Sequence, residues 1–519
     1  MKSSKYLIAL ITIASLLLSA LGCGQKVSEK ASTGGTTEKT LTLGLAQSPT
    51  NLDPAVEYNG WYTVEYGLGE TLFKINKDMK IRPWLAESWK RVDELTWKIK
   101  IRDNVFFHNN KKVDGKAVKV SLERSLRMNK RAPELLDIAS IEANGNEITV
   151  KTNHPNPALL NALADPLTVI VDAEAASAMG DAFAMKPILT GPFKLKEYVK
   201  DVQVVVERND DYWGERPKLE RVIIKLIPDA NTRIMALQAG EVQVANNIPA
   251  ESLEAIKKSR SFRTLSWSSV RTHMLIFNVK KPGLDDINVR KAINMAINRE
   301  DLANKVMKGS GIPAVSPYPL VLPFGGNELK GYAYQPDEAK KLLDAAGWKV
   351  GSDNIRRKNG KKLEFTVLCY KSRPELPVLL EAIQAELQEI GIKINISVVE
   401  NISDALKGDF DAAIYSINTA PTADPQYLLE IMFRTGASSN FGKYSNPRLD
   451  ALVDQLKTAF DTQKRNSIAK EAQQVLLDDA AFAFLVYPKT IVAMSNKVKG
   501  ITPSPTEYYL LTPEVTLAT

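Results

Sequence analysis

The segment Leu363-Glu364-Phe365-Thr366-Val367-Leu368 alternates apolar with polar side chains over most of its length, which is typical of a half-buried strand. The residues after it predict a helix from about Glu375 to Ile390, which Gly391 brings to an end. A second alternating strand follows at 392–396. This stretch therefore predicts a compact strand–helix–strand unit, the building block of α/β folds.

A second unit of the same kind lies about 140 residues earlier in the chain. Its first strand is 221–227, its helix is 230–239 with Asp229 as the N-cap, and Gly240 separates that helix from a short strand at 242–244. Two such units, so far apart, predict two α/β lobes rather than one large sheet.

Helical spacing of apolar residues predicts further helices in the second lobe. One is expected over 289–307, and another begins at Pro336, a proline at the first helical position. Asp424 is expected to cap a helix over 426–433, with Pro425 at its first position.

The first residues have the pattern of an export signal. Lys2 and Lys5 precede an uncharged stretch at 6–21, which is short for a membrane span because a span needs about 20 apolar residues. A positive start, a short apolar core and small residues before a cleavage site predict a signal peptide at 1–22. The mature chain is then expected outside the cytoplasm.

A cysteine follows the predicted cleavage site. Ser19-Ala20-Leu21-Gly22-Cys23 resembles a bacterial lipobox, in which the cysteine is lipidated and becomes the mature N-terminus. Residues 23–39 are rich in Ser, Thr, Gly and Lys and are expected to form a lipid-anchored flexible tether. The protein is then held in the periplasm or on the outer face of the cell membrane. The alternative is a plain signal peptide with an incidental cysteine.

The composition of the 519 residues is that of a globular protein, with 44% hydrophobic and 25% charged residues. Sixty-eight Lys and Arg against 60 Asp and Glu give a formal charge of +8. Both signs are spread along the chain without a long basic block, which indicates a solvated surface rather than a nucleic-acid partner. Two cysteines exclude a small fold held by several disulfides.

Catalytic and metal-binding patterns are missing from the sequence. The histidines are His108, His154 and His273, far apart and outside any metal-ligand spacing, so hydrogen-bonded or solvated roles are expected. There is no nucleophile elbow and no phosphate-binding loop of the Walker type. Cys369 follows an apolar strand and is expected to be buried. We therefore predict no enzymatic activity and no cofactor, with a secreted hydrolase as the alternative of another class.

Several short motifs occur in a fixed order along the chain. They begin with Ile81-Arg82-Pro83-Trp84-Leu85-Ala86-Glu87-Ser88-Trp89. The others are 95–97, 101–108, 190–193, 209–214, 227–233 with 237–241, 289–292 with 296–299, 345–348 and 444–447. The series resembles the family 5 extracellular solute-binding proteins, the peptide-, opine- and nickel-binding components of ABC importers. The resemblance covers nearly all of residues 40–495.

The resemblance implies a particular α/β architecture, the two-lobed periplasmic-binding-protein type II fold. Its lobes are linked by a hinge and close over a solute. Lobe I is expected at 40–72 with 190–275 and 490–519, its extra subdomain at 73–189, and lobe II at 276–489.

The resemblance also implies where the chain crosses between lobes and what it binds. The crossings are expected near 273–278 and 486–492. The partners are a small-molecule or peptide ligand, the permease subunits of the importer, and the membrane through the N-terminal lipid. The protein itself is expected to be a monomer.

Two subgroups of the family use ligand contacts that this sequence lacks. Dipeptide-type relatives hold the peptide amine with an aspartate, and Pro421 stands in that place, without charge or N–H. In nickel-type relatives an arginine holds the chelate's carboxylates, and Asp165 stands there. Two tryptophans of that subgroup align with Glu134 and Thr419. An acidic wall favours a cationic ligand, although Arg131 is an alternative partner for Glu134.

Aromatic and polar residues complete the predicted ligand site. Tyr58, Trp61 and Tyr62 lie in a segment that lines the cleft in relatives, where aromatic rings can stack on a ligand, although lobe packing is the alternative. From lobe II, Asn418 and Arg434 are expected to meet the solute, unless Arg434 pairs with Glu430 instead. The expected ligand is a short peptide or peptide-like amine, and the second candidate is a nickel or metallophore complex.

Overall fold

The computed structural model describes residues 39–518. The predicted signal peptide at 1–22, Cys23 and nearly all of the predicted tether at 23–39 lie outside these residues. Within the described range, no helix combines the length and the apolar character that a membrane span requires.

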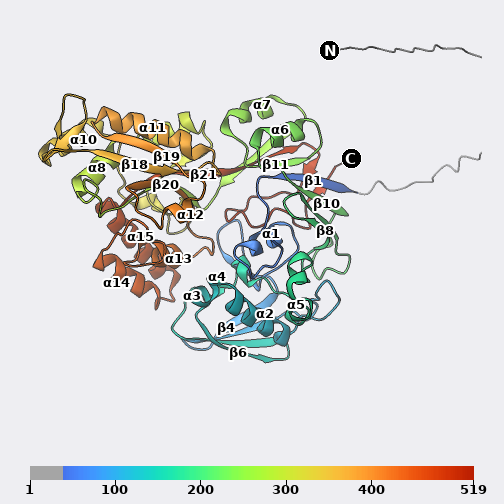
Figure 1. Ribbon diagram of the computed structural model, residues 1–519. Coiled ribbons are helices and arrows are strands. Elements are labelled where there is room, and N and C mark those ends of the chain that lie inside the picture. The colour runs from blue at the N-terminus through green and yellow to red at the C-terminus, as the bar shows by residue number, and fades with distance from the viewer. Residues whose placement is uncertain (1–38, 519) are drawn as a thin grey trace, which may run out of the picture. The chain divides into compact units, whose positions relative to one another are not determined.

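Twelve strands of the described chain are hydrogen-bonded in one connected sheet (Figure 1). In spatial order they are β19 (Lys393–Val398), β18 (Glu364–Cys369), β20 (Ala412–Asn418), β13 (Arg271–Phe277), β21 (Phe482–Ser495), β11 (Val244–Asn246), β1 (Thr40–Leu45), β10 (Arg221–Leu226), β9 (Gln203–Arg208) and β8 (Phe193–Val199), with β12 (Phe262–Ser268) and β14 (Gly311–Pro313) also paired to β21. The strands predicted at 363–368, 392–396, 221–227 and 242–244 are among them, which confirms both strand–helix–strand units.

The long strand β21 belongs to both halves of this sheet. Its first part, Phe482–Val486, pairs with β13, and its second part, Lys489–Ser495, pairs with β12 and in places with β11. Figure 1 shows β21 running from the half that carries β18 to β20 into the half that carries β1, β10 and β11. The structure has the two expected halves, but their sheets are not separate, because both halves share the strand β21.

The chain crosses between the halves at two adjacent points. The first is Ser269–Val270, between β12 and β13, and the second is Pro488–Lys489 within β21. The Ser269 Oγ donates to the Pro488 carbonyl at 2.9 Å, so the crossings touch. The crossing expected at 486–492 is confirmed. The one expected at 273–278 was placed too late, because Arg271 onward already pairs with β20.

Helices cover the faces of both half-sheets. In the first half they are α1 (Asn59–Glu65), α6 (Ala230–Gln238) and α7 (Leu253–Lys258). In the second half they are α8 (Ile287–Ala296), α10 (Pro336–Ala345), α11 (Glu375–Glu389), α12 (Ile402–Ala405), α14 (Pro447–Leu456) and α15 (Thr462–Asp478). The helices predicted at 230–239, at about 375–390 and from Pro336 are confirmed, and Cys369 is buried at the end of β18.

Two predicted helices differ from the structure, one in its length and one in its helical type. The helix expected over 289–307 ends at Ala296 in α8, because Ile297 is extended and Asn298 caps the new short helix α9 (Arg299–Asp301). A π-helical turn, η4 (Leu302–Val306), follows α9. The bounds of the helix expected over 426–433 are confirmed, but only its start is α-helical, as α13 (Gln426–Leu428), and the rest is a π-helical turn, η6 (Leu429–Phe433).

A separate antiparallel sheet lies within residues 73–189, the range predicted as an extra subdomain. Its strand order is β4 (Ala86–Arg91), β5 (Thr96–Ile101), β7 (Glu147–Thr152) and β6 (Ile138–Asn144). The helices of this region are α2 (Gly115–Met128), α3 (Ala132–Leu136), α4 (Leu159–Ala162) and α5 (Ala173–Met179), with the 3-10 turns η1 (Pro166–Thr168) and η2 (Gly180–Met185). The exact lobe and subdomain boundaries stay a prediction.

Short elements complete the described chain. They are the ladders β2 (Phe73–Ile75) with β3 (Ile81–Pro83), β15 (Lys349–Val350) with β16 (Arg356–Lys358) and β17 (Lys361–Lys362), and β22 (Val498–Lys499) with β23 (Thr516–Leu517), together with the 3-10 turns η3 (Ala250–Ser252) and η5 (Gly326–Glu328).

Candidate functional site

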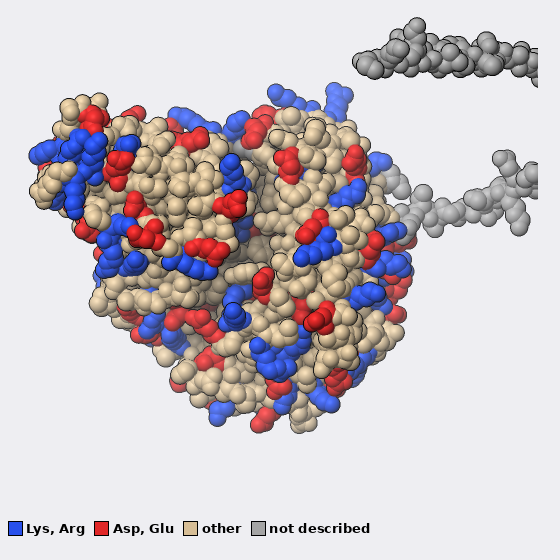
Figure 2. All heavy atoms as spheres, viewed as in Figure 1, with Lys and Arg blue, Asp and Glu red and all other residues tan. Residues whose placement is uncertain are grey.

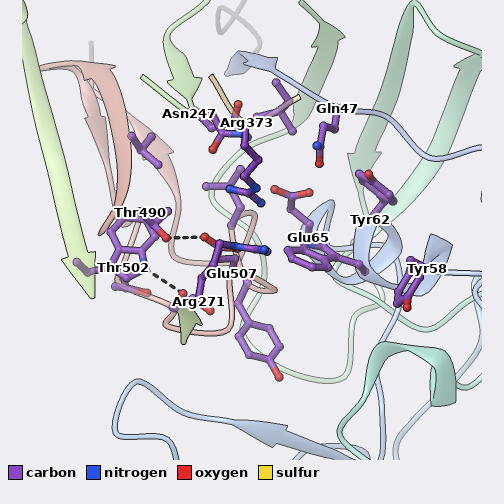
Figure 3. A pocket seen from close by; sticks show the side chains of 18 residues that line it. Gln47, Tyr58, Tyr62, Glu65, Asn247, Arg271, Arg373, Thr490, Thr502 and Glu507 are labelled. Atoms are coloured by element: carbon purple, nitrogen blue, oxygen red, sulfur yellow. Dashed lines mark hydrogen bonds and ion pairs between the residues drawn. The ribbon is translucent and has the colours of Figure 1, made fainter. Parts of the chain in front are cut away.

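A cavity of about 300 Å³ lies beside the two crossings, and we call it the charged cavity (Figure 3). The first half supplies most of its wall, from the ends of β1 and β11, from α1 and from the segment 502–510. Arg271 at the start of β13 and Arg373 just before α11 supply the wall from the second half. Figure 2 shows the surface hollowed between the halves, with charges of both signs scattered around the hollow.

Helix α1 brings aromatic and acidic side chains to this cavity. Trp61 and Glu65 are four residues apart on the helix, so they lie on the same face, and Tyr62 is adjacent. The helix sits close to η1 because residue 60 is glycine. A Cβ at Gly60 would lie 2.1 Å from the carbonyl oxygen of Pro166, far inside van der Waals contact.

Replacing Gly60 with alanine is expected to lower stability and to weaken ligand binding together. Alanine favours helix, but α1 would have to move away from η1 and would carry Trp61 and Glu65 with it. Gly408→Ala is the matched control, because Gly408 is exposed and a Cβ there meets only Ala405 O at 3.3 Å. Urea unfolding and isothermal titration measure both effects. If Gly60→Ala and Gly408→Ala changed stability and affinity to the same degree, the close contact between α1 and η1 would not be what positions the cavity wall.

Glu65 is a carboxylate without a partner. Among the described residues, no side chain forms an ion pair or a hydrogen bond with it. Burial raises the pKa of Glu65 to about 8, and the nearby Glu507 adds to this shift. In Figure 3 its carboxylate points into the cavity, toward Arg373 and Glu507.

Glu507, the second acid, is held by its surroundings. It accepts a hydrogen bond from Thr490 Oγ1 at 2.7 Å, and Arg271 Nη2 approaches it at 3.5 Å. Although burial alone would raise its pKa, Arg271 and Arg373 hold the pKa of Glu507 below its usual range. This carboxylate therefore stays ionised beside two cations.

Arg271 and Arg373 are the cations of the cavity. Arg271 is only 7% exposed and its Nε has no hydrogen-bond partner. Burial lowers the pKa of Arg271, and the proximity of Arg373 lowers it further. Arg373 makes no ion pair and no side-chain hydrogen bond within residues 39–518. Arg271 contacts Glu507, whereas Arg373, which also lies near Glu375, keeps its side-chain N–H groups without an acceptor in this part of the chain and can bind an anionic group.

Behind these arginines lies His273, the most buried of the histidines. Its Nε2 is 3.2 Å from Glu375 Oε1, and burial lowers its pKa. His108 is hydrogen-bonded to the Gly191 carbonyl at 3.0 Å and His154 approaches Asp137 at 3.1 Å. His108 and His154 have the hydrogen-bonded or solvated roles expected from the sequence, whereas His273 is fully buried and neither of its ring nitrogens forms a hydrogen bond within the described residues.

A second space, which we call the groove, has a volume of about 660 Å³. It lies between α3 with the segment 153–162 and the second-half residues 422–458, and it shares Tyr58 with the charged cavity. The Arg131 guanidinium lies over the Tyr58 ring at 4.7 Å and over the Tyr427 ring at 5.8 Å. Arg131 therefore connects the two halves where the two spaces meet.

Other contacts also join the halves around the cleft. The Asn161 side chain donates to the Thr422 carbonyl at 2.7 Å. The Arg91 guanidinium lies 3.9 Å from the centre of the Phe460 ring, which also packs against Trp97. The halves therefore touch across the cleft as well as at the crossings.

The predicted aromatic residues are placed on the cavity wall. Tyr58, Trp61 and Tyr62 all line the charged cavity, and Tyr58 is 60% exposed. Trp61 also packs edge-on against Tyr508, with ring centres 5.3 Å apart. Trp61 therefore both lines the cavity and takes part in packing within its own lobe.

The predicted acidic residues differ in their surroundings. Glu134 is exposed and lines the groove. Asp165 is only 3% exposed and lines neither space. Its carboxylate is paired within the protein, since Arg131 Nη2 lies 3.0 Å from it and Leu167 N–H donates to it at 3.0 Å. The expectation that Asp165 offers a free charge to the ligand is therefore corrected. The alternative partner suggested for Glu134, Arg131, is taken by Asp165.

The predicted second-half residues face other groups. Asn418 pairs in register with Arg271 on β13, but it lines neither space. Thr419 is fully buried and its hydroxyl donates to the Val270 carbonyl at 2.9 Å. Arg434 pairs with Asp454 at 2.6 Å and with Glu430 at 3.6 Å, so the ion-pair alternative to a ligand role forms.

The structure adds four residues that sequence reasoning missed, namely Glu65, Arg271, Arg373 and Glu507. No motif marks them, and they come from four separate segments. Among the described residues, no group of three or more His, Cys, Asp or Glu side chains is arranged to hold a metal ion.

The comparisons with known proteins define the class to which this two-lobed fold belongs. Residues 80–440 match the family model of bacterial extracellular solute-binding proteins, family 5 (middle region). The chain belongs to this family, whose members are substrate-binding proteins that work with ABC permeases. Its fold is the periplasmic-binding-protein type II fold.

Particular relatives bind different solutes. The nickel-binding protein NikA of Staphylococcus aureus is 28% identical over 504 residues, 97% of each chain. Its structure in complex with Ni(L-His)2 has a TM-score of 0.80 and covers 92% of this chain and 100% of that chain. The oligopeptide-binding protein AppA of Bacillus subtilis, in complex with a nonapeptide, is 25% identical with a TM-score of 0.78, covering 93% and 100%.

Proposed function

We propose that this protein is an extracytoplasmic lipoprotein that binds a peptide or peptide-like solute in the charged cavity and delivers it to an ABC importer. The observation that carries the proposal is the uncompensated charge of both signs in one cavity. Among the described residues neither Glu65 nor Arg373 forms an ion pair, while Arg271 approaches Glu507 at 3.5 Å. A solute with an amine and a carboxylate supplies both missing partners.

Closure of the halves explains how the solute is captured. Glu65 belongs to the first half, whereas Arg373 belongs to the second. Only when the halves are together do both charges face the same small space. Binding energy gained at both walls therefore favours the closed form, which is the form that a permease can distinguish. A cavity of about 300 Å³ is at the small end of ligand sites, which suits a short solute.

A nickel–amino-acid chelate is the alternative within the family. The relation to NikA of S. aureus supports it, and the two arginines could hold the carboxylates of such a chelate. Against it, Asp165 stands at the position of the arginine that the nickel-type subgroup uses, and Asp165 is paired with Arg131 away from both spaces. No geometric observation favours a hydrolase.

Mass spectrometry of the full protein, extracted from its membrane in mild detergent, tests the proposal. We expect a co-purified peptide-like solute under native conditions and a lipid on the Cys23 end of the processed chain. Added dipeptides should raise the thermal unfolding temperature without being cleaved, because a ligand that favours the native state adds RT ln(1 + [L]/Kd) to stability. Stabilisation by Ni(L-His)2 alone would favour the chelate, and steady peptide cleavage would contradict the proposal.

A further inference from the structure

Glu65 is the least compensated charge in the interior of the cleft. The close contact between Gly60 and η1 sets the position of α1 and so brings Glu65 to the cavity wall. Glu65 is half-buried there, and a carboxylate in such a place is neutralised either by a proton or by a cation. The fold therefore holds an unpaired carboxylate at a defined point of the cavity wall.

A second and independent observation comes from the facing wall. Arg271 is more than nine-tenths buried, lines the same cavity, and leaves its Nε without an acceptor. Arg373 adds a second guanidinium from the other half of the protein. The two acids of the lining, Glu65 and Glu507, thus come from the first half and the two arginines from the second (Figure 3).

We propose that Glu65 receives the cationic amine of the solute, while Arg271 and Arg373 receive its anionic end, so that the cavity selects zwitterions in one orientation. This assignment rests on the proposed function. The segment 419–425 offers no rival site for an amine in either space, because Pro421 has no charge and Asp424 is paired with Arg465 at 2.7 Å. Glu65 would then be the specificity-determining residue for the amine.

The assignment predicts that binding releases a proton. With a pKa raised to about 8, Glu65 is mostly protonated at neutral pH in the empty cavity. A bound ammonium group stabilises the carboxylate and expels that proton. Affinity for an amine-bearing solute should therefore rise with pH from about 5 toward 8 and fall at higher pH, because the free α-amino group, with a pKa of about 8, then loses its own charge.

Other titratable groups face Glu65 and define the background of this effect. They are Tyr62 and Tyr66 on α1, Glu507 and Tyr509 in the C-terminal segment, and Arg271 and Arg373 on the facing wall. Burial raises the pKa of Tyr62 to about 12, and Arg271 and Arg373 keep Glu507 ionised. Burial also raises the pKa of Tyr66 and Tyr509, so these tyrosines stay neutral between pH 5 and 8.

The test compares Glu65→Gln with the wild type and with Glu134→Gln, an exposed acid of the neighbouring groove. The probes are a pool of alanyl dipeptides with free termini, the same pool N-acetylated, and the same pool amidated at the C-terminus. Isothermal titration from pH 5.5 to 8.5, in buffers of different ionisation enthalpy, gives affinity and proton release. We expect the wild type to prefer free amines at least tenfold over acetylated ones, to release a proton below pH 8, and E65Q to lose both properties.

The outcomes separate this assignment from the proposed function. If the wild type binds dipeptides but E65Q keeps the preference for free amines, or E134Q loses it, the assignment is overturned and the function stands. If none of the pools binds the wild type, both are overturned. E65Q should fold at least as well as the wild type at pH 8, because it removes a carboxylate whose raised pKa makes the wild type lose stability as pH rises from about 4.5 through 8.

Discussion

Replacing Arg373 with alanine is expected to weaken the binding of a carboxylate-bearing solute by roughly 30-fold or more. Truncating one partner of a buried, hydrogen-bonded charge pair costs about 2 kcal/mol or more, much of it from the charge left unpaired. Arg373 has no partner within the described protein that would compete for it, so its full hydrogen-bonding capacity is open to the solute. The loss should appear in the dissociation rate more than in the association rate.

The matched control is Lys371→Ala, an exposed cation two residues earlier, which should leave affinity unchanged. A dipeptide amidated at its C-terminus should lose little affinity in the Arg373 variant, because its carboxylate is already absent. Titration calorimetry with free and amidated dipeptides measures both effects. A variant that loses affinity for both probes to the same degree would show that Arg373 shapes the cleft without touching the carboxylate.

Replacing Arg465 with methionine is expected to lower the free energy of unfolding by about 3–5 kcal/mol, since it leaves a buried charge unpaired. Arg465 and Asp424 are 5% and 6% exposed, and Arg465 Nη2 lies 2.7 and 2.8 Å from the two carboxylate oxygens. The same guanidinium donates to the carbonyls of Leu456 and Ala459 at 2.5 and 3.0 Å. These bonds join α15 to the end of α14 and to the segment before α13.

Arg448→Met is the control, because Arg448 and Glu471 join the same two helices at 2.9 Å but are 64% and 49% exposed. An exposed pair contributes about 0–1 kcal/mol, so this variant should unfold at nearly the wild-type urea concentration. The double variant Asp424→Leu with Arg465→Met should recover part of the loss, since both charges are then gone. Equal midpoints for the Arg448 and Arg465 variants would refute the importance of the buried pair.

Local patterns in the sequence were sufficient for most of the individual elements. The strands at 363–368 and 392–396 and the helix between them depend on alternation, on helical spacing and on Gly391, all of which act over a few residues. The predicted helix over 289–307 failed for a non-local reason. Arg299 is held by the Phe484 carbonyl of β21, a contact that no pattern in that segment could reveal.

The binding site was less predictable than the fold. The aromatic residues of α1 were found because they follow a motif position, and they line the cavity. The charges that matter come from α1, β13, the start of α11 and the C-terminal segment, and nothing in the sequence links these four places. Asp165 shows the opposite error. Its place in the sequence suggested a carboxylate free to bind a ligand, but in the folded protein Asp165 is paired with Arg131.

The shared strand β21 has a consequence for the order in which the chain is assembled. It stands between β13 and β11 in the sheet, so neither half-sheet is complete until residues 482–495 have been made. A chain emerging from its N-terminus must hold β11 and β12 without the neighbour β21, which arrives almost at the end. If the chain is exported before it folds, all of its strands are present when folding starts, and β21 can pair with both half-sheets at once.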